Sequence, residues 1–458
     1  MDRKMRNILI TGGILLIVVC ICIGLIALAG TGIFMLKAQP TSLAVATEML
    51  PTPLPTLPSE NHLSPELAQQ MDLIQSQVIA IRGLEPSNTV PRTLLTDDQL
   101  RQNVINDFLN EYTPEEAAQD ARILAALGLL PDDFDLIDFY TELYSEQVAG
   151  YYDDEAKAMY VVQGSDFRGT EKLTYAHEYV HVLQDQVYDF KGRLGYTDEM
   201  CQEDSERCAG IQSLIEGDAS LTELLWFQSY ASQQDYKDIL AYYDGFESPV
   251  YDLAPSYMKV DFMFPYEKGQ AFVQTLYDQG GFSSVDAAFL KPPASTEQIL
   301  HPDKYLVDLP TPVPLPDLTQ VLGEGWVEVD RNVMGEWYTY LILAHSHEPA
   351  FRLEEDVALN AAAGWGGDTY LVYMHEDSNQ VIFIMRSTWD DTRDLDEFYE
   401  AFLQYGLKRW GEAFEDDLLS NAWQGEGFYS SFFIQDTFST WILTPDIQFD
   451  RQIKQALP

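Results

Sequence analysis

The residues in this sequence best suited to chemistry are two histidines four positions apart with a glutamate between them. They form the run His177-Glu178-Tyr179-Val180-His181. Residues i and i+4 of an α-helix share one face, so both imidazoles can bind one metal ion while Glu178 reaches a water on that ion. The neighbouring Leu173 and Leu183 are apolar, which favours a helix packed inside a fold over a surface helix with two exposed histidines.

A catalytic zinc site needs a third protein ligand and one open position. The run Ile211–Leu221 predicts a second helix in which Glu216 lies among apolar residues. A carboxylate there is costly to bury unless it is paired or binds a metal. We therefore predict that Glu216 completes, with the two histidines, a site for one Zn²⁺ per chain. Asp218 and Glu223 are rival carboxylates; Asp218 could instead orient a ligand histidine or simply be solvated.

These motifs resemble those of the gluzincin zinc metallopeptidases. In the aminopeptidase-N-like branch a Glu-Gly-x-Ala step carries the third ligand, and here Glu216-Gly217-Asp218-Ala219 follows the His-Glu-x-x-His run. Pro265-Tyr266-Glu267-Lys268-Gly269 is similar to the segment that opens a long helix in that branch, which predicts a helix from Tyr266 to Gln279. The resemblance implies that Tyr266 stabilises the oxyanion; a tyrosine that only begins a helix is the alternative. The resemblance covers about Leu173 to Leu276.

Two departures from that branch bear on function. The Gly-x-Met-Glu-Asn exopeptidase motif is absent, and its place is taken by Gly150–Val162, which predicts two short strands. Nothing in the sequence therefore recognises a free amino terminus. The interval between His181 and Glu216 is also longer than in the branch, and it contains Cys201 and Cys208. These cysteines could form a disulfide beside the site in an oxidising compartment, or remain two free thiols.

If the site binds zinc, the chemistry is hydrolysis of a peptide bond. Zinc would lower the pKa of its water, Glu178 would act as the general base and pass the proton to the leaving amine, and Tyr266 would share the charge of the oxyanion with zinc. We expect peptides or unfolded protein segments as substrates. The alternatives are a catalytically inactive relative that serves as a surface binding or sensing module, and a zinc hydrolase of a non-peptide bond.

The N-terminal residues indicate a membrane anchor. Arg3, Lys4 and Arg6 precede an uncharged run from Asn7 to Leu36, and about 20 apolar residues suffice to cross a bilayer as a helix. We therefore expect a single-pass protein of the cell membrane with a cytoplasmic N-terminus and an extracytoplasmic catalytic domain. Cleavage after residue 29, as in a signal peptide, is the alternative.

The remaining chain divides at two proline-rich stretches. We predict a cytoplasmic stub and transmembrane anchor at 1–37, a Pro/Thr-rich linker at 38–62, a zincin-like peptidase domain with a helical lead-in at 63–309, a Pro-rich joint at 310–317 and a small α+β domain at 318–458. The fold class is thus α+β behind a transmembrane helix. With 27 Lys+Arg against 73 Asp+Glu, the net charge of −46 excludes a nucleic-acid-binding protein. Four cysteines exclude a disulfide-built scaffold.

Overall fold

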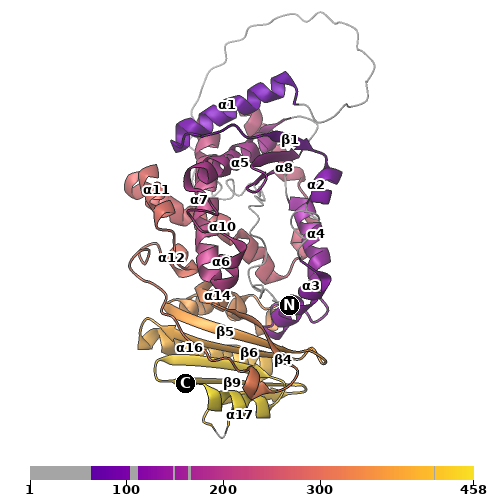
Figure 1. The fold of residues 1–458 in the computed structure, drawn as a ribbon, viewed down its shortest axis with the longest axis vertical. Helices are drawn as coiled ribbons and strands as arrows, with labels where there is room; N and C mark the ends of the chain where they lie inside the picture. Colours follow the sequence, from indigo (N-terminus) through magenta and orange to yellow (C-terminus); the bar gives the residue numbers. More distant parts are fainter. Residues whose placement is uncertain (1–62, 104–111, 148–149, 163–166, 417, 458) are drawn as a thin grey trace, which may run out of the picture.

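The protein combines a helical N-terminal part with a C-terminal part built on a β-sheet (Figure 1). The computed structural model describes residues 63–103, 112–147, 150–162, 167–416 and 418–457. Two sheets, of three and seven strands, occur with the helices in this part of the chain. The prediction of an α+β fold is confirmed.

The predicted membrane anchor requires a correction. Its residues, 1–37, and those of the linker, 38–62, lie outside the described residues. Within the described ranges no helix is both long and apolar enough to cross a bilayer. The physical reason is that even the longest helix, α7 (Ser205–Tyr230), carries charged residues such as Arg207, Asp218 and Glu223 along its length. The transmembrane helix in the predicted fold class and the single-pass location that depended on it are therefore not supported.

The chain before the histidine helix forms four helices and a small sheet within its described residues. Strand β3 lies between β1, to which it is parallel, and β2, to which it is antiparallel. Residue Tyr152 on β2 pairs with Met159 on β3, and β2 forms one edge of this sheet. The elements are α1 (Pro65–Arg82), β1 (Arg92–Leu95), α2 (Asp97–Asn103), α3 (Pro114–Ala126), α4 (Leu136–Gln147), β2 (Gly150–Asp153) and β3 (Ala158–Val162).

Three long helices form the centre of the helical part: α5 (Gly169–Tyr188), α7 and α10 (Ser256–Gly280). Helix α7 packs against both α5 and α10, and α1 packs across α5 and α7. The interior is apolar around the histidines, with side chains such as Val180, Ile215 and Phe272 fully buried. Shorter helices complete this part: α6 (Asp198–Glu203), α8 (Gln233–Gly245), α9 (Pro249–Leu253), α11 (Phe282–Leu290) and α12 (Thr296–Leu300).

Helix α10 begins ten residues earlier than the sequence indicates. The motif predicts a start at Tyr266, whereas the helix runs from Ser256 and contains Pro265 in its interior. An interior proline removes one backbone hydrogen bond and costs about 3 kcal/mol. The turns before it bury large side chains, including Tyr257, Met258 and Phe264, and this burial offsets that cost.

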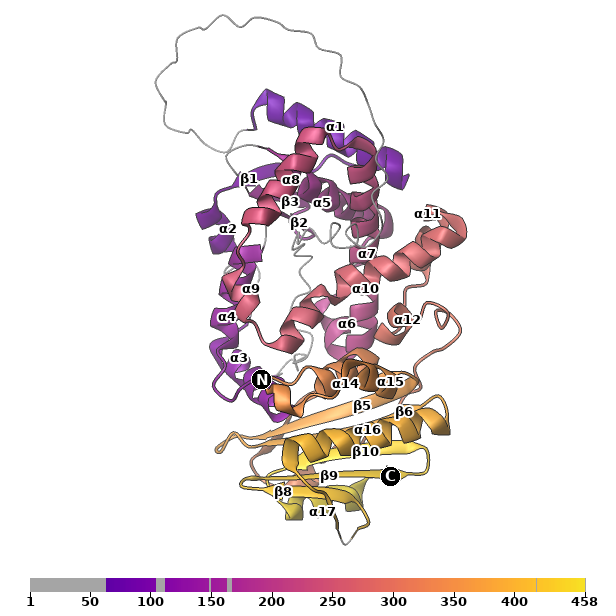
Figure 2. The same cartoon turned by 180° about the vertical axis from the view of Figure 1, so that it is seen from behind.

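The C-terminal part is one antiparallel sheet with helices on both faces (Figure 2). Its strand order is β4-β5-β6-β10-β9-β8-β7. The strands are β4 (Trp326–Asn332), β5 (Trp365–His375), β6 (Val381–Trp389), β7 (Phe414–Glu415), β8 (Asn421–Gly425), β9 (Phe428–Gln435) and β10 (Phe438–Thr444). The helices are α13 (Thr319–Leu322), α14 (Gly335–Ala344), α15 (Glu355–Ala362), α16 (Thr392–Trp410) and α17 (Ile447–Ala456), with a 3₁₀ turn at Pro349–Phe351.

Alternation along the strands gives the sheet two buried faces. On β5, Tyr370 and Val372 face the apolar cluster that continues into the helical part, whereas Leu371 and Tyr373 face a second cluster under α13 and α17. This is the period of two expected of a strand. The predicted boundary at 310–317 falls in a stretch without regular structure between α12 and α13, while the first cluster spans both sides of it. The division into two domains stays a prediction.

Helices α7 and α10 cross in backbone contact at two glycines. A Cβ at Gly217 would overlap the carbonyl oxygen of Gly269, and a Cβ at Gly269 would overlap that of Ser213. Both glycines belong to the motifs that resemble the gluzincin peptidases. Their role in this fold is steric, because only a residue without a side chain allows the two backbones to approach so closely.

We therefore expect Gly269→Ala to lower the free energy of unfolding by about 2 kcal/mol, because the added methyl group forces the helices apart. Gly245→Ala, at the end of α8, is the matched control, since its Cβ would meet nothing within 4 Å. Urea denaturation of both variants and the parent measures the difference. A Gly269→Ala protein as stable as the parent would show that the crossing tolerates a side chain.

Candidate metal centre

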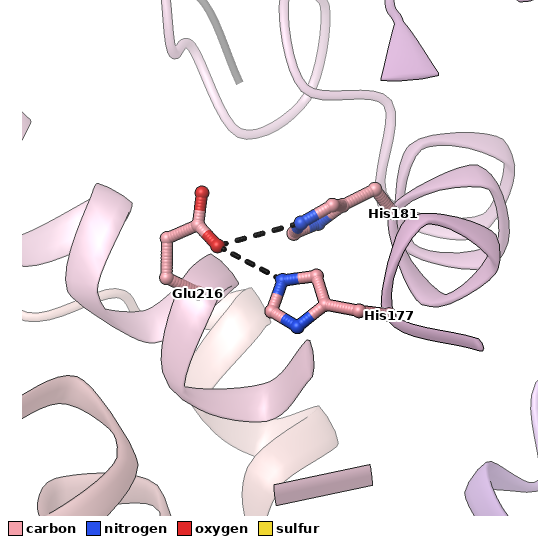
Figure 3. Close-up of side chains that lie close together, drawn as sticks. All are labelled: His177, His181 and Glu216. Atoms are coloured by element: carbon pink, nitrogen blue, oxygen red, sulfur yellow. Dashed lines mark hydrogen bonds and ion pairs between the residues drawn. The ribbon is translucent and has the colours of Figure 1, made fainter. Parts of the chain in front are cut away.

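Two histidines and one glutamate from two helices meet in the interior of the helical part (Figure 3). His177 and His181 come from successive turns of α5, and Glu216 comes from α7. Oε2 of Glu216 lies 3.2 Å from Nε2 of His177 and 3.4 Å from Nε2 of His181. The three potential ligand atoms lie within 4.8 Å of one another, and the three residues are at most 2% exposed. The structure thus brings together all three predicted ligands.

Hydrogen bonds on the outer side of each imidazole determine which nitrogen faces the centre. Nδ1 of His177 lies 2.7 Å from Oε2 of Glu223, and Nδ1 of His181 lies 2.8 Å from the amide oxygen of Gln184. Each of these oxygens accepts a hydrogen bond, so each Nδ1 carries the proton. The lone pair of each neutral imidazole then lies on Nε2, which points at Glu216. This is the arrangement in which histidine binds a metal.

Several buried polar atoms of the candidate metal centre lack a hydrogen-bond partner within the described part of the chain. Among the described residues, Nε2 of His181, Oε1 of Glu216 and Oε1 of Glu178 have no hydrogen-bond partner, although all three are buried. A lone pair that faces a carboxylate repels it unless a cation lies between them. Two imidazole nitrogens with one carboxylate oxygen are a donor set of catalytic zinc sites. The residues present therefore fit a metal ion, and zinc is one that they would suit.

The pKa shifts of His177 and Glu216 also indicate that positive charge stabilises the metal centre. Burial lowers the pKa of His177, but its hydrogen bonds with Glu216 and Glu223 outweigh burial and raise the pKa to about 10. Burial raises the pKa of Glu216, but the two histidines outweigh it and lower the pKa below its usual value. In the absence of a metal, these contacts thus favour a proton on His177.

Glu178 lies beside the ligands and contacts the edge strand of the small sheet. Its Oε2 accepts a hydrogen bond of 2.9 Å from the backbone N–H of Tyr152 on β2. The hydroxyl of Tyr152 donates to Asp185, one turn beyond His181, so β2 is attached to α5 at two points. Burial raises the pKa of Glu178 well above its usual range. A cation bound at the centre would oppose this shift, because an opposite charge favours the carboxylate.

Tyr266 is brought next to the centre by the crossing of α7 and α10. Its ring centroid lies 6.4 Å from that of His177, and the residue is 7% exposed. The sequence motif therefore locates a tyrosine that is a neighbour of a ligand in the fold, although α10 itself begins earlier than predicted.

The remaining residues singled out from the sequence have different neighbours. Asp218 contacts neither histidine directly: it accepts from Gln184, at 2.8 Å, and from Arg82, at 2.7 Å. Glu223, considered only as a rival ligand, is the partner of His177. Gln184 and Arg82 were not predicted from the sequence. The position of Gln184, one helical turn after His181, does indicate that the two side chains are neighbours.

The two cysteines form a disulfide that joins α6 to the first turn of α7. Cys201 and Cys208 are both buried, at 3% and 1% exposure. Cys208 precedes Glu216 by about two helical turns, or roughly 12 Å along α7. The disulfide therefore restrains the start of α7, the helix that carries Glu216.

Three other carboxylates lie as close together as metal ligands do, but they surround a lysine. Glu297, Asp308 and Asp390 lie close together near the end of α12. The ammonium group of Lys304 lies among them, 2.6 Å from Glu297 and 2.5 Å from Asp390. Lysine thus already supplies the positive charge there, and this group is an ion-pair network.

Comparison with known proteins concerns only the C-terminal part. Residues 320–445 match a domain of unknown function, DUF8575. This match spans β4 to β10 and excludes every residue of the candidate metal centre. No curated protein and no solved structure matches the chain.

We expect Glu223→Ala to weaken metal binding by about 10–100-fold, because His177 loses the partner that holds its Nδ1–H. Glu223→Gln is the matched control, since its amide oxygen can still accept from Nδ1 and most of the affinity should remain. Competition with a chelating dye measures both. Equal affinity of Glu223→Ala and the parent would contradict the assigned role.

Proposed function

We propose that the protein is a zinc-dependent metallopeptidase of gluzincin type that hydrolyses bonds in peptides or unfolded protein segments. The observation that carries the proposal is the convergence of His177, His181 and Glu216, with Glu178 beside them. The motifs that resemble the gluzincin peptidases supply these same residues, and their order along the chain supports the proposal further.

The proposed reaction divides the work between the metal and this chain's side chains. When bound, zinc would supply a Lewis acid that makes water more acidic and polarises a carbonyl group. Glu178 accepts the proton of the attacking water and delivers it to the leaving amine. The hydroxyl of Tyr266 stabilises the negative charge that develops on the carbonyl oxygen. Glu223 and Gln184 keep the two imidazoles in the tautomer that ligation requires.

The small sheet favours a peptide over other substrates. Strand β2 is at the edge of this sheet, and its residue Tyr152 contacts Glu178. An extended peptide that adds to this edge through backbone hydrogen bonds would replace the bond between Tyr152 and Glu178, which would bring its carbonyl groups to the proposed base. The absence of the Gly-x-Met-Glu-Asn motif from the sequence favours cleavage that does not depend on a free amino terminus.

We expect the purified full chain to contain about one zinc per molecule by elemental analysis. Glu216→Ala should lose the metal, because two imidazoles alone bind it weakly. Glu247→Ala, which removes an exposed glutamate outside the centre, should retain it. A parent protein that stays free of zinc after reconstitution would refute the proposal and favour an inactive binding module.

We expect Glu178→Gln to retain zinc but to cleave a library of unfolded peptides about 10²–10⁴-fold more slowly, because an amide cannot accept the proton. Cleavage assays with mass spectrometry of the products measure the rate and show which bonds are cut. A zinc-loaded parent that cleaves no peptide would instead favour hydrolysis of another bond.

We expect Tyr266→Phe to reduce kcat about 10²–10³-fold with little change in KM or zinc content, because the hydroxyl acts on the transition state. Tyr277→Phe, at a half-buried position on the same helix, is the matched control and should leave kcat unchanged. An unchanged kcat in Tyr266→Phe would show that the Tyr266 hydroxyl has no part in catalysis and that the side chain only packs.

A further inference from the structure

A chain of buried polar contacts runs from one metal ligand to the first described helix. Nδ1 of His181 lies 2.8 Å from Oε1 of Gln184, and Nε2 of Gln184 donates to Oδ2 of Asp218, also at 2.8 Å. Nε of Arg82, the last residue of α1, donates to both oxygens of Asp218, at 2.7 and 2.9 Å. These four residues are at most 1% exposed. The chain thus links α5, α7 and α1 beneath the centre.

The orientation of the Gln184 amide decides the state of His181. A glutamine amide has one end that only accepts hydrogen bonds and one that only donates. Its donor end faces two acceptors, the carboxylate of Asp218 and the backbone carbonyl oxygen of Ile215, at 2.8 and 3.0 Å. The acceptor end must therefore face His181, which requires a proton on Nδ1 and leaves the lone pair of Nε2 directed at the centre. A flipped amide would place its oxygen against two other acceptors, the carboxylate of Asp218 and the carbonyl oxygen of Ile215.

Arg82 and Asp218 form a buried ion pair whose position matters more than its energy. Both side chains are 0% exposed. A buried ion pair seldom stabilises a fold more than apolar residues of the same volume would, because removing two charges from water is costly. This pair, however, supplies the acceptor that orients Gln184. Arg82 is in turn held by an ion pair of 2.7 Å with Asp286 and by the ring of Phe282, 4.6 Å from its guanidinium.

We propose that Gln184, Asp218 and Arg82 form a positioning relay that holds His181 in its metal-binding tautomer. The inference rests on the metal site of the proposed function and deepens it. Gln184 acts on the ligand directly, Asp218 orients Gln184, and Arg82 supplies the counter-charge for Asp218. None of the three binds the metal or the substrate. Through this relay the metal affinity depends on Arg82 of α1, which lies 95 positions before His177 in the sequence.

The first test removes the amide. Gln184→Leu keeps the volume but removes the acceptor for Nδ1 of His181, and we expect zinc affinity to fall about 10–100-fold. The visible absorption bands of the Co²⁺-loaded protein should also change shape, because a histidine without its partner no longer binds in one orientation. Neither readout depends on peptidase activity, and thermal melting of the metal-free variant verifies that it folds.

The second test removes the ion pair and keeps the packing. Arg82→Met combined with Asp218→Leu leaves no buried charge unpaired, because Asp286, the other ion-pair partner of Arg82, has a side chain that is 42% exposed. We therefore expect a folded protein whose zinc affinity nevertheless falls at least tenfold. Arg82→Lys keeps the counter-charge and should recover most of the affinity. Tyr188→Phe is the matched control: it removes the bond of 3.4 Å from Arg82 to Tyr188 and the bond of 2.7 Å from Tyr188 to Asp286, but it leaves the pair of Arg82 with Asp218. This variant should bind zinc as the parent does.

The outcomes separate this inference from the function on which it rests. A parent protein that binds neither zinc nor cobalt overturns the proposed function and the relay with it. A parent that binds zinc, together with a folded Gln184→Leu protein of equal affinity and an unchanged cobalt spectrum, overturns the relay alone. If the double variant does not fold, Gln184→Leu decides, because it acts at the link nearest the ligand.

Discussion

The backbone contact between α7 and α10 is the constraint on which the centre depends. At Gly217 and Gly269 the helices approach so closely that neither position has room for a Cβ. The contact lies one residue beyond Glu216 on α7 and three residues beyond Tyr266 on α10. It therefore sets the distance between the helix that carries the third ligand and the helix that carries the neighbouring tyrosine. A wider crossing would move Tyr266 away from His177.

Around that crossing, electrostatics explain why the interior tolerates so many polar groups. The carboxylates of Glu178 and Glu216 are buried beside two imidazoles, and that of Glu223, whose side chain is 14% exposed, contacts one of them. Such a cluster is costly unless a cation balances it. The raised pKa of His177 favours a proton there in the metal-free protein, and a metal ion would replace that proton. Binding would thus be coupled to proton release, as is usual when histidine ligates.

The C-terminal part contributes a β-sheet and no residue of the candidate metal centre. Its seven-stranded sheet buries one face against the cluster shared with the helical part and the other against α13 and α17. The region that matches the domain of unknown function lies wholly within this part. The candidate chemistry is confined to the helices before it.

Local spacing in the sequence determined the histidine pair, the helix that bears Glu216 and the strand pair at Gly150–Val162, because helical and strand periods act over a few residues. It misjudged the start of α10, because burial of Tyr257 and Phe264 outweighs an interior proline. Only the tertiary structure decided the partners of the ligands. Arg82 and Asp218 are 136 residues apart, and His177 and Glu223 are 46 apart. No local pattern links such residues, since only the packing of α1, α5 and α7 brings them together.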